Sequence, residues 1–324
     1  MIFTGIISRR TFVFVLKSSP LYVETLIQVP LEAVWTETQD PMRHQAWDLR
    51  FTEISYLPKA APEDPQQFIY VTRIGLGLRV EGRGQSAVTR IGATGERTSL
   101  LRFWSDDPKS IIREGGGYWR YLPEAGGVKF LTLYSYRTRG GAMGAGVDRL
   151  VFRPLLGWAT AWSFDCLRLA LETHVPPRRL WTQVAAALVL RVTHASIWIY
   201  QGVVPKWLFP DSGELEILRG TGLFTGSEAL VLTLMGGAEI GLGVSLFYWI
   251  NSTRLLVGVA VTLLVLLGGA VIGPPGILTA PFNPVSLTTA MLGLIGTELW
   301  LRRDPLPDAS RCRRVPTVNL RPLP

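Results

Sequence analysis

The sequence predicts two domains of different classes. An α+β domain, with an antiparallel sheet wrapped on a long C-terminal helix, is followed by an all-α four-helix transmembrane bundle. Charged residues are frequent in the first half of the 324-residue chain, but no Asp, Glu, Lys or Arg lies between Arg254 and Glu298. The first half instead contains segments of strand-like alternation and then one segment of helical spacing. A change of this kind indicates a water-soluble domain followed by a membrane domain.

We expect the α+β domain to cover residues 20–173. "YVETLIQV" at 22–29 alternates as a strand does, and the helix that follows it is opened by Pro30. Further strand segments are separated by Gly-, Pro- and Asp-rich turn material. They lie at 51–57, 66–74, 78–91, 97–105, 116–122 and 127–138, and the long helix occupies 147–174. Residues 1–19 are expected to form an uncertain extension or an extra strand, because their apolar piece "TFVFVL" is too short to span a bilayer.

The membrane domain is expected over residues 174–302. Four apolar runs are each about 20 residues long, the length that crosses a bilayer; they lie at 180–204, 227–250, 255–272 and 283–301. Arginines gather before the first run, between the second and third, and after the fourth. This bias predicts a cell (inner) membrane protein with both termini and the α+β domain in the cytoplasm. We expect the Pro- and Arg-rich tail, 303–324, to be disordered and to lie against anionic lipid.

A polar stripe interrupts the first apolar run. Arg191, His194, Trp198 and Gln201 are spaced by three, four and three residues and therefore share one helix face. An arginine near the bilayer centre should find a carboxylate inside the bundle. We expect Glu239 as its partner and Glu298 as the second candidate. Such a pair either fixes helix register or forms a ligand or proton site, and the sequence leaves both open.

The composition and the motifs exclude several functions. The formal net charge is +8, but many arginines flank apolar runs, which fits a membrane anchor and predicts no nucleic-acid partner. Cys166 and Cys312 have no metal-ligand or CxxC spacing, so no metal is expected. His44 lies in a polar turn and is interpreted as a surface residue. No catalytic constellation is present, and we predict no catalytic residue and no cofactor; whether the chain is an enzyme stays uncertain, with a non-catalytic role favoured.

The stretch "VETLIQVPLEAVWTETQDPMRHQAWD" resembles the START-like helix-grip superfamily, also called SRPBCC or polyketide cyclase-like. The resemblance covers residues 20–173 and carries a strand, the pattern P-x-x-x-V-W and a Trp after the second short helix. It implies a cavity for an apolar ligand between the sheet and the long helix. The candidate lining residues are Trp35, Trp47, Tyr70, Trp104, Trp119, Tyr134 and Trp162. Packing in the domain core explains most of these aromatic residues equally well.

The segments "WIYQGVVPKW", "GGAEIGLG" and "PFNPVSLTTAMLGL" resemble the DoxX-like family of four-helix membrane modules. The residues that match its pattern include Phe282 and Asn283, and the resemblance places Asn283 and Lys206 near the outer face, where Lys206 can snorkel. Relatives of this family are associated with quinone-linked oxidation, which implies a membrane oxidoreductase as a partner. The membrane half lacks cysteines, haem ligand pairs and flavin motifs, so the resemblance does not extend to redox catalysis by this chain.

Three functional hypotheses follow from the two resemblances. In the first, the helix-grip domain binds or senses a lipid or quinone-like molecule and couples it to the membrane bundle, so that its partners are the lipid bilayer and a hydrophobic small molecule. In the second, the protein is an accessory subunit of a membrane redox complex. In the third, it is a small transporter with Arg191, His194 and Glu239 as a polar relay. The first is the main prediction.

Overall fold

The computed structural model describes residues 2–7, 10–15, 20–61, 64–75, 77–92, 95–272, 275–279, 281 and 283–316. The chain divides into two compact units, which are described separately. The first consists of Met1–Leu180 and Leu306–Pro324, and the second of Trp181–Pro305. Phe282, which the DoxX-like resemblance includes, lies outside the described residues.

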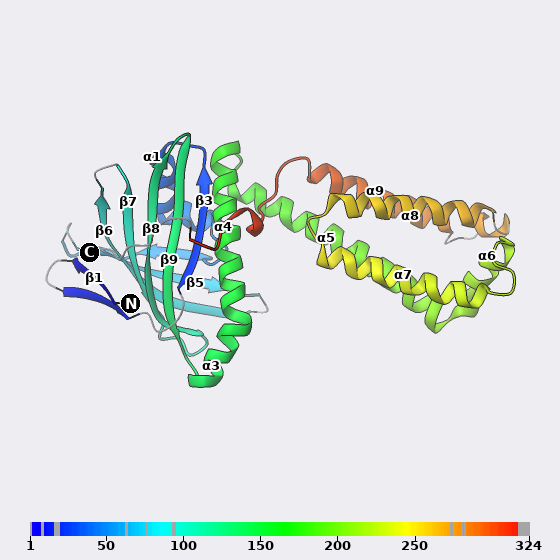
Figure 1. Cartoon of the computed structure of the whole chain (residues 1–324), viewed down its shortest axis with the longest axis horizontal. Helices are drawn as coiled ribbons and strands as arrows, with labels where there is room; N and C mark the ends of the chain where they lie inside the picture. The colour runs from blue at the N-terminus through cyan, green and yellow to red at the C-terminus, as the bar shows by residue number, and fades with distance from the viewer. Residues whose placement is uncertain are drawn as a thin grey trace. The chain divides into compact units, whose positions relative to one another are not determined.

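A seven-stranded antiparallel sheet forms the main layer of the first unit (Figure 1). Its spatial order is β3-β9-β8-β7-β6-β5-β4, so the first strand pairs with the last. The strands are β3 (Leu21–Ile27), β4 (Glu53–Tyr56), β5 (Gln66–Arg73), β6 (Arg79–Ile91), β7 (Arg97–Trp104), β8 (Ile112–Glu124) and β9 (Gly127–Thr138). They correspond to the seven segments expected from alternation. In the N-terminal extension, β1 (Ile2–Ile7) and β2 (Arg10–Val15) pair as a separate two-stranded sheet.

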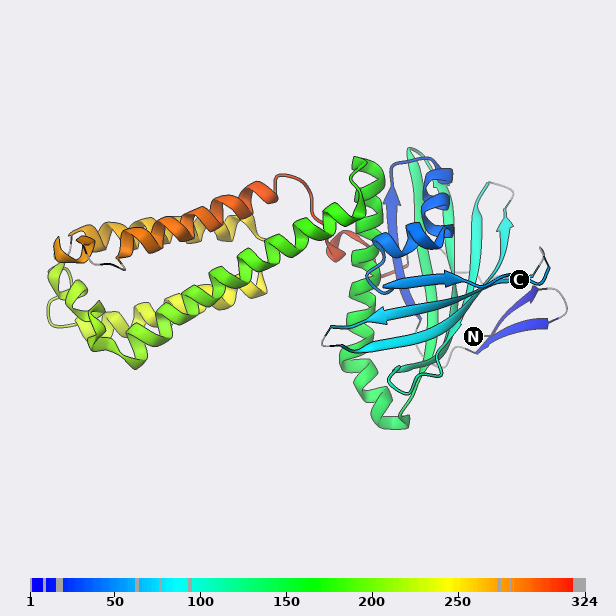
Figure 2. The same cartoon turned by 180° about the vertical axis from the view of Figure 1, so that it is seen from behind.

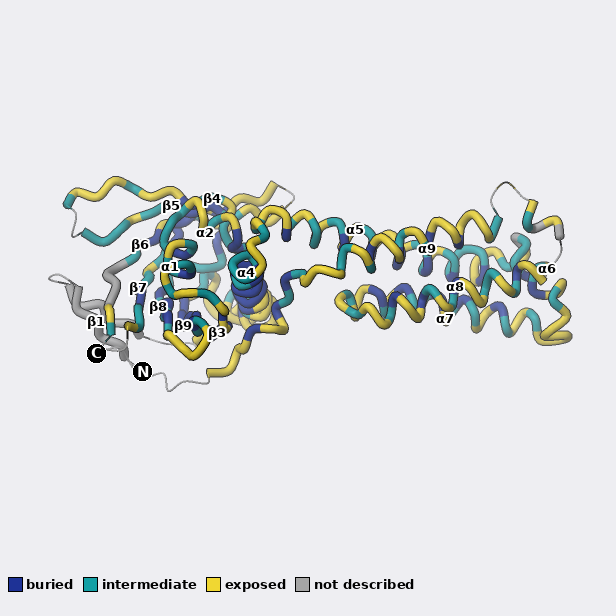
Figure 3. The backbone as a smooth tube through the Cα atoms, turned by 90° about the horizontal axis from the view of Figure 1, so that it is seen from above, coloured by how far each residue is buried: buried dark blue, intermediate teal, exposed yellow. Residues whose placement is uncertain are grey.

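Helices cover one face of the sheet. Two short helices, α1 (Leu31–Gln39) and α2 (Pro41–Trp47), connect β3 to β4, and the Asp40 carboxylate caps α2 by accepting from the amides of Met42 and Arg43. A continuous helical segment follows β9: α3 (Gly141–Val147), the π-helical turn η1 (Asp148–Phe152) and α4 (Arg153–Thr173). Helix α4 runs alongside β3 and β9 (Figures 1 and 2), and its buried turns are dark blue in Figure 3.

The contact between α4 and the sheet is aromatic. The ring of Phe164 on α4 stacks on that of Phe130 on β9, with centroids 4.4 Å apart. Both rings are fully buried, and burying aromatic area of this size is a large share of a small domain's apolar stabilisation. An antiparallel sheet that wraps on a long C-terminal helix is the helix-grip architecture, which confirms the fold expected for residues 20–173.

The second unit contains four helices that are long and apolar enough to cross a membrane. They are α5 (Pro177–Gln201) with its π-helical continuation η2 (Gly202–Leu208), α7 (Glu228–Tyr248), α8 (Thr253–Ile272) and α9 (Pro284–Leu301); the short α6 (Glu214–Gly220) precedes α7. Their core consists of Ala195, Trp198, Leu246, Leu256, Val259, Leu263, Met291 and Ile295. The four expected spans are therefore present.

Glycines allow α5 and α7 to approach closely. A Cβ atom on Gly202 would lie 2.5 Å from the carbonyl oxygen of Gly236, and one on Gly243 would lie 2.9 Å from that of Ala195. Neither position has room for a side chain. Gly236 and Gly243 are the first and last glycines of "GGAEIGLG", so the packing role expected for this segment is confirmed.

The expectation of a disordered tail at 303–324 is wrong for residues 306–316, which belong to the first unit. This segment packs on the first unit: Arg313 forms a backbone bridge with Glu24 on the edge strand β3, and Cys312 Sγ donates to the Ala161 carbonyl of α4. The buried Asp165 carboxylate accepts from the Asp308 amide at 2.8 Å and from Arg311 at 3.3 Å. A buried anion and an unpaired strand edge thus hold a segment whose basic composition had suggested lipid contact. Residues 317–324 lie outside the described part.

Candidate functional site

The strand register shows which side chains face α4. Tyr134 points toward α4, because its hydroxyl lies 3.0 Å from Thr160 Oγ1. Gly117 is the cross-strand partner of Tyr134, and Leu101 is the partner of Gly117. Because directly opposed residues share one face of a sheet, Leu101 and Gly117 also face α4. We call this side the inner face.

Glycines on the inner face are covered by aromatic rings from neighbouring strands. A Cβ atom on Gly84 would lie 2.2 Å from the ring of Phe68, and one on Gly82 would lie 2.3 Å from that of Tyr70. The ring of Phe103 covers Gly115 in the same way, at 2.5 Å. The rings therefore lie flat along the sheet where side chains would otherwise stand upright. The inward-facing side chains of β6 and β8 therefore fill little of the space between the sheet and α4.

Part of the inner face stays accessible. On β5 and β7, Phe68, Leu101 and Phe103 are only half-buried, and on the facing helix so is Leu156. The same face is closed at its other end, where Phe130 and Phe164 stack. Apolar side chains turned toward a covering helix would normally be fully buried. The inner face therefore has a packed end near β9 and an incompletely filled part over β5 to β8.

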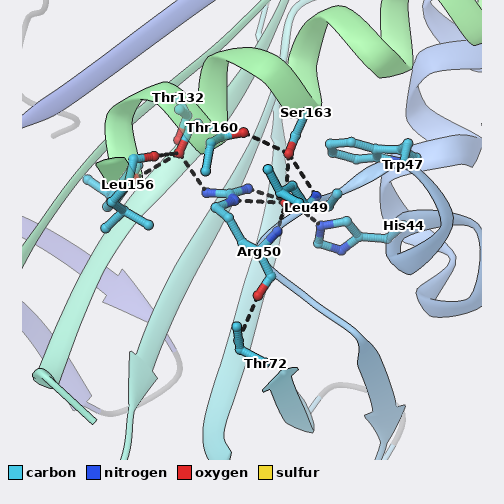
Figure 4. A network of polar contacts seen from close by, with 12 residues as sticks. His44, Trp47, Leu49, Arg50, Thr72, Thr132, Leu156, Thr160 and Ser163 are labelled. Atoms are coloured by element: carbon cyan, nitrogen blue, oxygen red, sulfur yellow. Dashed lines mark hydrogen bonds and ion pairs between the residues drawn. The ribbon is translucent and has the colours of Figure 1, made fainter. Parts of the chain in front are cut away.

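A buried ion pair lies beside the incompletely filled part (Figure 4). The Asp48 carboxylate has no exposed surface and accepts from Arg50 Nη2 at 2.6 Å and from Arg50 Nε at 2.9 Å. Ser163 on α4 donates to the same carboxylate at 3.2 Å. Arg50 Nη1 reaches Thr160 Oγ1 at 3.4 Å. The pair thus links the loop before β4 to the centre of α4.

Electrostatics favour the charged form of this pair. Burial alone would raise the pKa of the Asp48 carboxyl, but the adjacent Arg50 guanidinium and the hydrogen bonds from Arg50 and His44 outweigh it and hold that pKa well below its usual range. The same carboxylate raises the pKa of Arg50 against the effect of its burial. Both groups are therefore ionised at neutral pH.

His44 belongs to this site, and the prediction that it is a surface residue is wrong. Its ring stacks on Trp47 with centroids 4.9 Å apart and meets Trp119 edge-on at 5.0 Å. Nε2 of His44 donates to Asp48 Oδ2 at 2.9 Å. His44 lies on helix α2, whose N-terminus is capped by Asp40. The sequence analysis did not identify Arg50, Thr160 and Ser163 as members of this network. The opposite charges of Asp48 and Arg50 in "WDLRF" are a sequence signal that could have indicated the ion pair.

The seven aromatic residues that were expected to line one cavity lie in several different places in the first unit. Trp47 and Trp119 both pack against His44. Tyr70 covers Gly82 on the inner face, and the Tyr134 hydroxyl lies beside Thr160. Trp35 on α1 meets Tyr121 edge-on. Trp162 is buried on α4.

The prediction is wrong for Trp104. This residue follows Phe103 on β7, and successive side chains of a strand point to opposite faces. Its register partner is Arg83, which alternates with the inward-facing Gly82 and Gly84. Trp104 therefore lies on the outer face of the sheet.

A second polar site lies in the membrane bundle. The Arg191 guanidinium donates to the Glu298 carboxylate, from Nη2 at 2.6 Å and from Nε at 2.9 Å, and both side chains are fully buried. Arg302 Nε donates to the same carboxylate at 2.8 Å. The carbonyl oxygens of Trp249 and Ile250 accept from Arg191 and Arg302, respectively. The Glu298 carboxylate and two backbone carbonyls thus accept hydrogen bonds from two arginines.

The expected pairing of Arg191 with Glu239 is wrong, and the second candidate, Glu298, is the partner. The helix Pro177–Leu208 has 32 residues, about 48 Å at roughly 1.5 Å per residue, whereas a bilayer core is about 30 Å thick. Arg191 lies level with the turn between α7 and α8, since its contact Trp249 is the C-cap of α7. The midpoint of this long helix is therefore at one end of the bundle and not at its centre.

Glu239 instead pairs with Lys206. Lys206 Nζ lies 3.0 Å from Glu239 Oε2 and 3.3 Å from Glu214 Oε2. Lys206 is buried, so the expectation that it snorkels to the outer surface is wrong; the π-helical turn η2 carries it into the bundle. The proposed relay of Arg191, His194 and Glu239 is divided between two separate clusters.

The remaining residues of the predicted polar site have different roles. His194 and Trp198 are buried, and their ring nitrogens have no hydrogen-bond partner within the described part of the chain. Gln201 is half-buried at the last position of α5. Asn283 is the N-cap of α9, where its side chain accepts from the Ser286 amide at 3.0 Å.

Known proteins resemble both halves of the chain. Residues 195–296 match the sequence profile of the DoxX-like family. A relative in Bacillus subtilis (strain 168), named "Uncharacterized membrane protein YndG", is 40% identical over 230 residues, which cover 71% of this chain and 77% of that protein. Four candidate spans and this relative identify a multi-pass membrane protein.

Solved structures resemble the first unit distantly. A STAR-related lipid transfer protein fragment from Xanthomonas axonopodis has a TM-score of 0.38 at 15% identity and covers 53% of this chain and 98% of its own. TTHA0849 from Thermus thermophilus has a TM-score of 0.37 at 17% identity and covers 46% of this chain and 94% of its own. The helix-grip fold is assigned from the strand order and the long helix given above. The chain belongs to the same family as the Bacillus subtilis membrane protein YndG, and its membrane-spanning half is DoxX-like over residues 195–296.

Proposed function

We propose that this protein binds a membrane-soluble, mainly apolar small molecule on the inner face of its helix-grip domain. The observation that carries the proposal is the incompletely filled part of that face. Phe68, Leu101 and Phe103 turn toward α4 but are only half-buried, and four glycines leave neighbouring inward positions without side chains. Concave apolar surface with a few polar groups beside it is typical of small-molecule sites.

The polar groups at this face suggest the chemistry of the ligand. Arg50 reaches the inner face with its guanidinium, which lies 3.4 Å from Thr160 Oγ1 through Nη1 and also interacts with the Tyr134 hydroxyl. The Tyr134 hydroxyl lies beside Thr160 as well. A carbonyl, hydroxyl or carboxylate oxygen of the ligand would accept from Arg50 or Tyr134, while its apolar body would lie on the rings of Phe68 and Phe103. The ligand is therefore an amphiphile with one oxygen-bearing end.

We place the helix-grip domain and the described C-terminal segment in the cytoplasm, at the inner membrane. Four spans return the chain to its starting side, and residues 306–316 belong to the same unit as the helix-grip domain, which supports a common side. Arg178, Arg179, Arg254, Arg302 and Arg303 flank the spans on that side. An excess of Lys and Arg favours the cytoplasm. A domain tethered there is positioned to exchange a lipid-soluble ligand with the bilayer.

The test is extraction of bound small molecules from the purified full-length protein, followed by mass spectrometry. Leu101→Trp would place a larger ring on the half-buried part of the inner face and should remove most of the bound molecule, because the ring occupies its position. Ser55→Trp is the matched control: Ser55 is exposed, and it alternates with the inward-facing Ile54 on β4. This control should retain the molecule. A wild-type protein that releases no small molecule beyond bulk lipid, or a Leu101→Trp variant that retains it fully, would contradict the proposal.

A further inference from the structure

Two buried side chains of α5 carry polar atoms that lack a hydrogen-bond partner in the described part of the chain. The atoms are both ring nitrogens of His194 and Nε1 of Trp198. His194 is fully buried, and Trp198 is 2% exposed. Burying a polar atom without a partner is unfavourable, and buried polar groups are normally hydrogen-bonded. Three such atoms within two turns of one helix therefore indicate a place where a ligand completes the hydrogen bonding.

These side chains lie beside the ionic cluster at one end of the bundle. Arg191, His194 and Trp198 are spaced by three and four residues, so they share one side of α5. This side faces α9, because Arg191 Nη2 reaches Glu298 Oε1 there at 2.6 Å. The charges of Glu298 and Arg191 act on His194. His194 and Trp198 thus extend the polar side of α5 from the ionic cluster into the bundle.

The surroundings of Trp198 are apolar. It belongs to a core that contains Leu256 and Val259 of α8 and Met291 and Ile295 of α9. An indole has one N–H donor, and a neutral imidazole has one N–H donor on one of its two nitrogens. Two N–H donors within apolar walls fit an oxygen that accepts hydrogen bonds and belongs to a mainly apolar molecule.

The neighbouring ionic cluster has an excess of positive charge. It contains two arginines, Arg191 and Arg302, and one carboxylate, Glu298, which gives 2 − 1 = +1. The Arg191 side chain is fully buried, and that of Arg302 is 10% exposed. A buried charge is stabilised by an opposite charge nearby. Both guanidinium groups already donate to Glu298 and to backbone carbonyls, so the hydrogen bonds to an added anion would come from His194 and Trp198.

We propose that the membrane bundle binds a long-chain fatty acid, whose carboxylate accepts hydrogen bonds from His194 and Trp198. The carboxylate supplies the acceptor that both rings lack, and its charge neutralises the excess of the ionic cluster. The hydrocarbon chain lies among the apolar side chains of α8 and α9. An ester oxygen would satisfy the same donors but would leave the excess charge uncompensated, so the site should prefer the free acid. This site lies within the second unit and does not depend on the ligand proposed for the helix-grip domain.

The test is nuclear magnetic resonance of the full-length protein with nitrogen-15 in its histidine rings. The chain has three histidines, so few signals need assignment. The separate variants His44→Gln and His174→Gln assign two of them, and the remaining signals belong to His194. The protein is placed in nanodiscs of phosphatidylcholine, which has no free carboxylate, and is titrated with oleate at mildly alkaline pH, where the probe is ionised.

Oleate should shift the ring signals of His194 until they saturate and should leave those of the exposed His174 unchanged. Methyl oleate, which lacks the carboxylate, should shift them much less. Trp198→Phe keeps an aromatic ring but removes the N–H donor, so the affinity for oleate should fall about tenfold, as expected for the loss of one hydrogen bond to a charged group. Trp300→Phe is the matched control, because Trp300 on α9 is 65% exposed, and it should bind as wild type does.

Three results would overturn the proposal. The first is a His194 ring that does not respond to oleate, and the second is an equal response to methyl oleate. The third is a Trp198→Phe variant that binds oleate as tightly as wild type, with unchanged His44 and His174 signals to show that it is folded. His44 lies in the helix-grip domain and reports binding there, so a shift of His44 alone would overturn the site in the bundle while leaving the function proposed for the other domain intact.

Discussion

The Arg191 guanidinium and the Glu298 carboxylate, 107 positions apart in the chain, form a fully buried ion pair with a shortest N–O distance of 2.6 Å. The pair joins the first and last membrane-spanning helices. Arg302 and the carbonyls of Trp249 and Ile250 complete it, so groups from α5, from the end of α9 and from the turn between α7 and α8 meet at this point. We propose that this pair locks the register of the spanning helices.

Replacing one partner of this lock should destabilise the bundle strongly. Glu298→Leu leaves Arg191 buried and unpaired, which costs about 3–5 kcal/mol in comparable buried pairs. The double variant Arg191→Leu, Glu298→Leu should recover part of that loss, because no uncompensated charge remains. Unfolding in detergent, followed by tryptophan fluorescence, measures both. Arg191→Leu combined with Glu239→Leu serves as the comparison and should show additive losses, since these residues belong to separate clusters.

The buried pair of the helix-grip domain predicts acid sensitivity. The pKa of Asp48 lies well below its usual range in the folded protein, so its ionised form stabilises the fold. That contribution is complete above the unfolded pKa, roughly 4, and is lost as the pH falls from there toward the folded pKa. Asp48→Asn should therefore melt at lower temperature than wild type at pH 7, and the difference should shrink at pH 3.

Melting curves from pH 7 to pH 3 for the purified full-length protein check this. Asp106→Asn, on an exposed residue, is the control and should follow wild type throughout. A constant gap between wild type and Asp48→Asn across that pH range would contradict the assignment of the acid-sensitive charge to Asp48.

The strands and the membrane spans could be predicted from the sequence, but the partners of the buried charged residues could not. Alternation in "YVETLIQV" and length in the apolar runs are local signals, so they predict strands and spans directly. The partner of Arg191 depends on where a 32-residue helix meets the turn between α7 and α8, and no local pattern records that depth. Arg311 and Arg313 are similar: their basic side chains suggested lipid, whereas the Asp165 carboxylate and the β3 edge, far away in sequence, hold their segment.

The glycines of the inner face should differ in their tolerance of a methyl group. A Cβ on Gly84 meets the ring of Phe68, which can rotate, whereas one on Gly117 meets the backbone oxygen of Leu133 at 2.1 Å. Gly117→Ala must therefore shift the β8–β9 ladder, and overpacking of this kind costs about 1–3 kcal/mol. Gly84→Ala should cost less. Thermal unfolding of the two variants compares them, and equal losses would show that the backbone contact is not the cause.

The segment after the last span should come loose when its buried anion is removed. Asp165 has no exposed side-chain surface and accepts from Arg168, Arg311 and the Asp308 amide. Asp165→Asn keeps the size of the side chain but removes the charge, so these contacts weaken. Trypsin should then cleave after Arg311 and Arg313 much faster than in wild type, where the backbone of Arg313 bridges to Glu24.

Glu172→Gln is the matched control, because Glu172 also pairs with Arg168 on α4 but has no bond to this segment among the described contacts. Cleavage rates followed by mass spectrometry of the released peptides give the result. If Asp165→Asn is cleaved no faster than Glu172→Gln, the Asp165 carboxylate does not hold the segment, and its other contacts, with the β3 edge and with the Ala161 carbonyl, must do so.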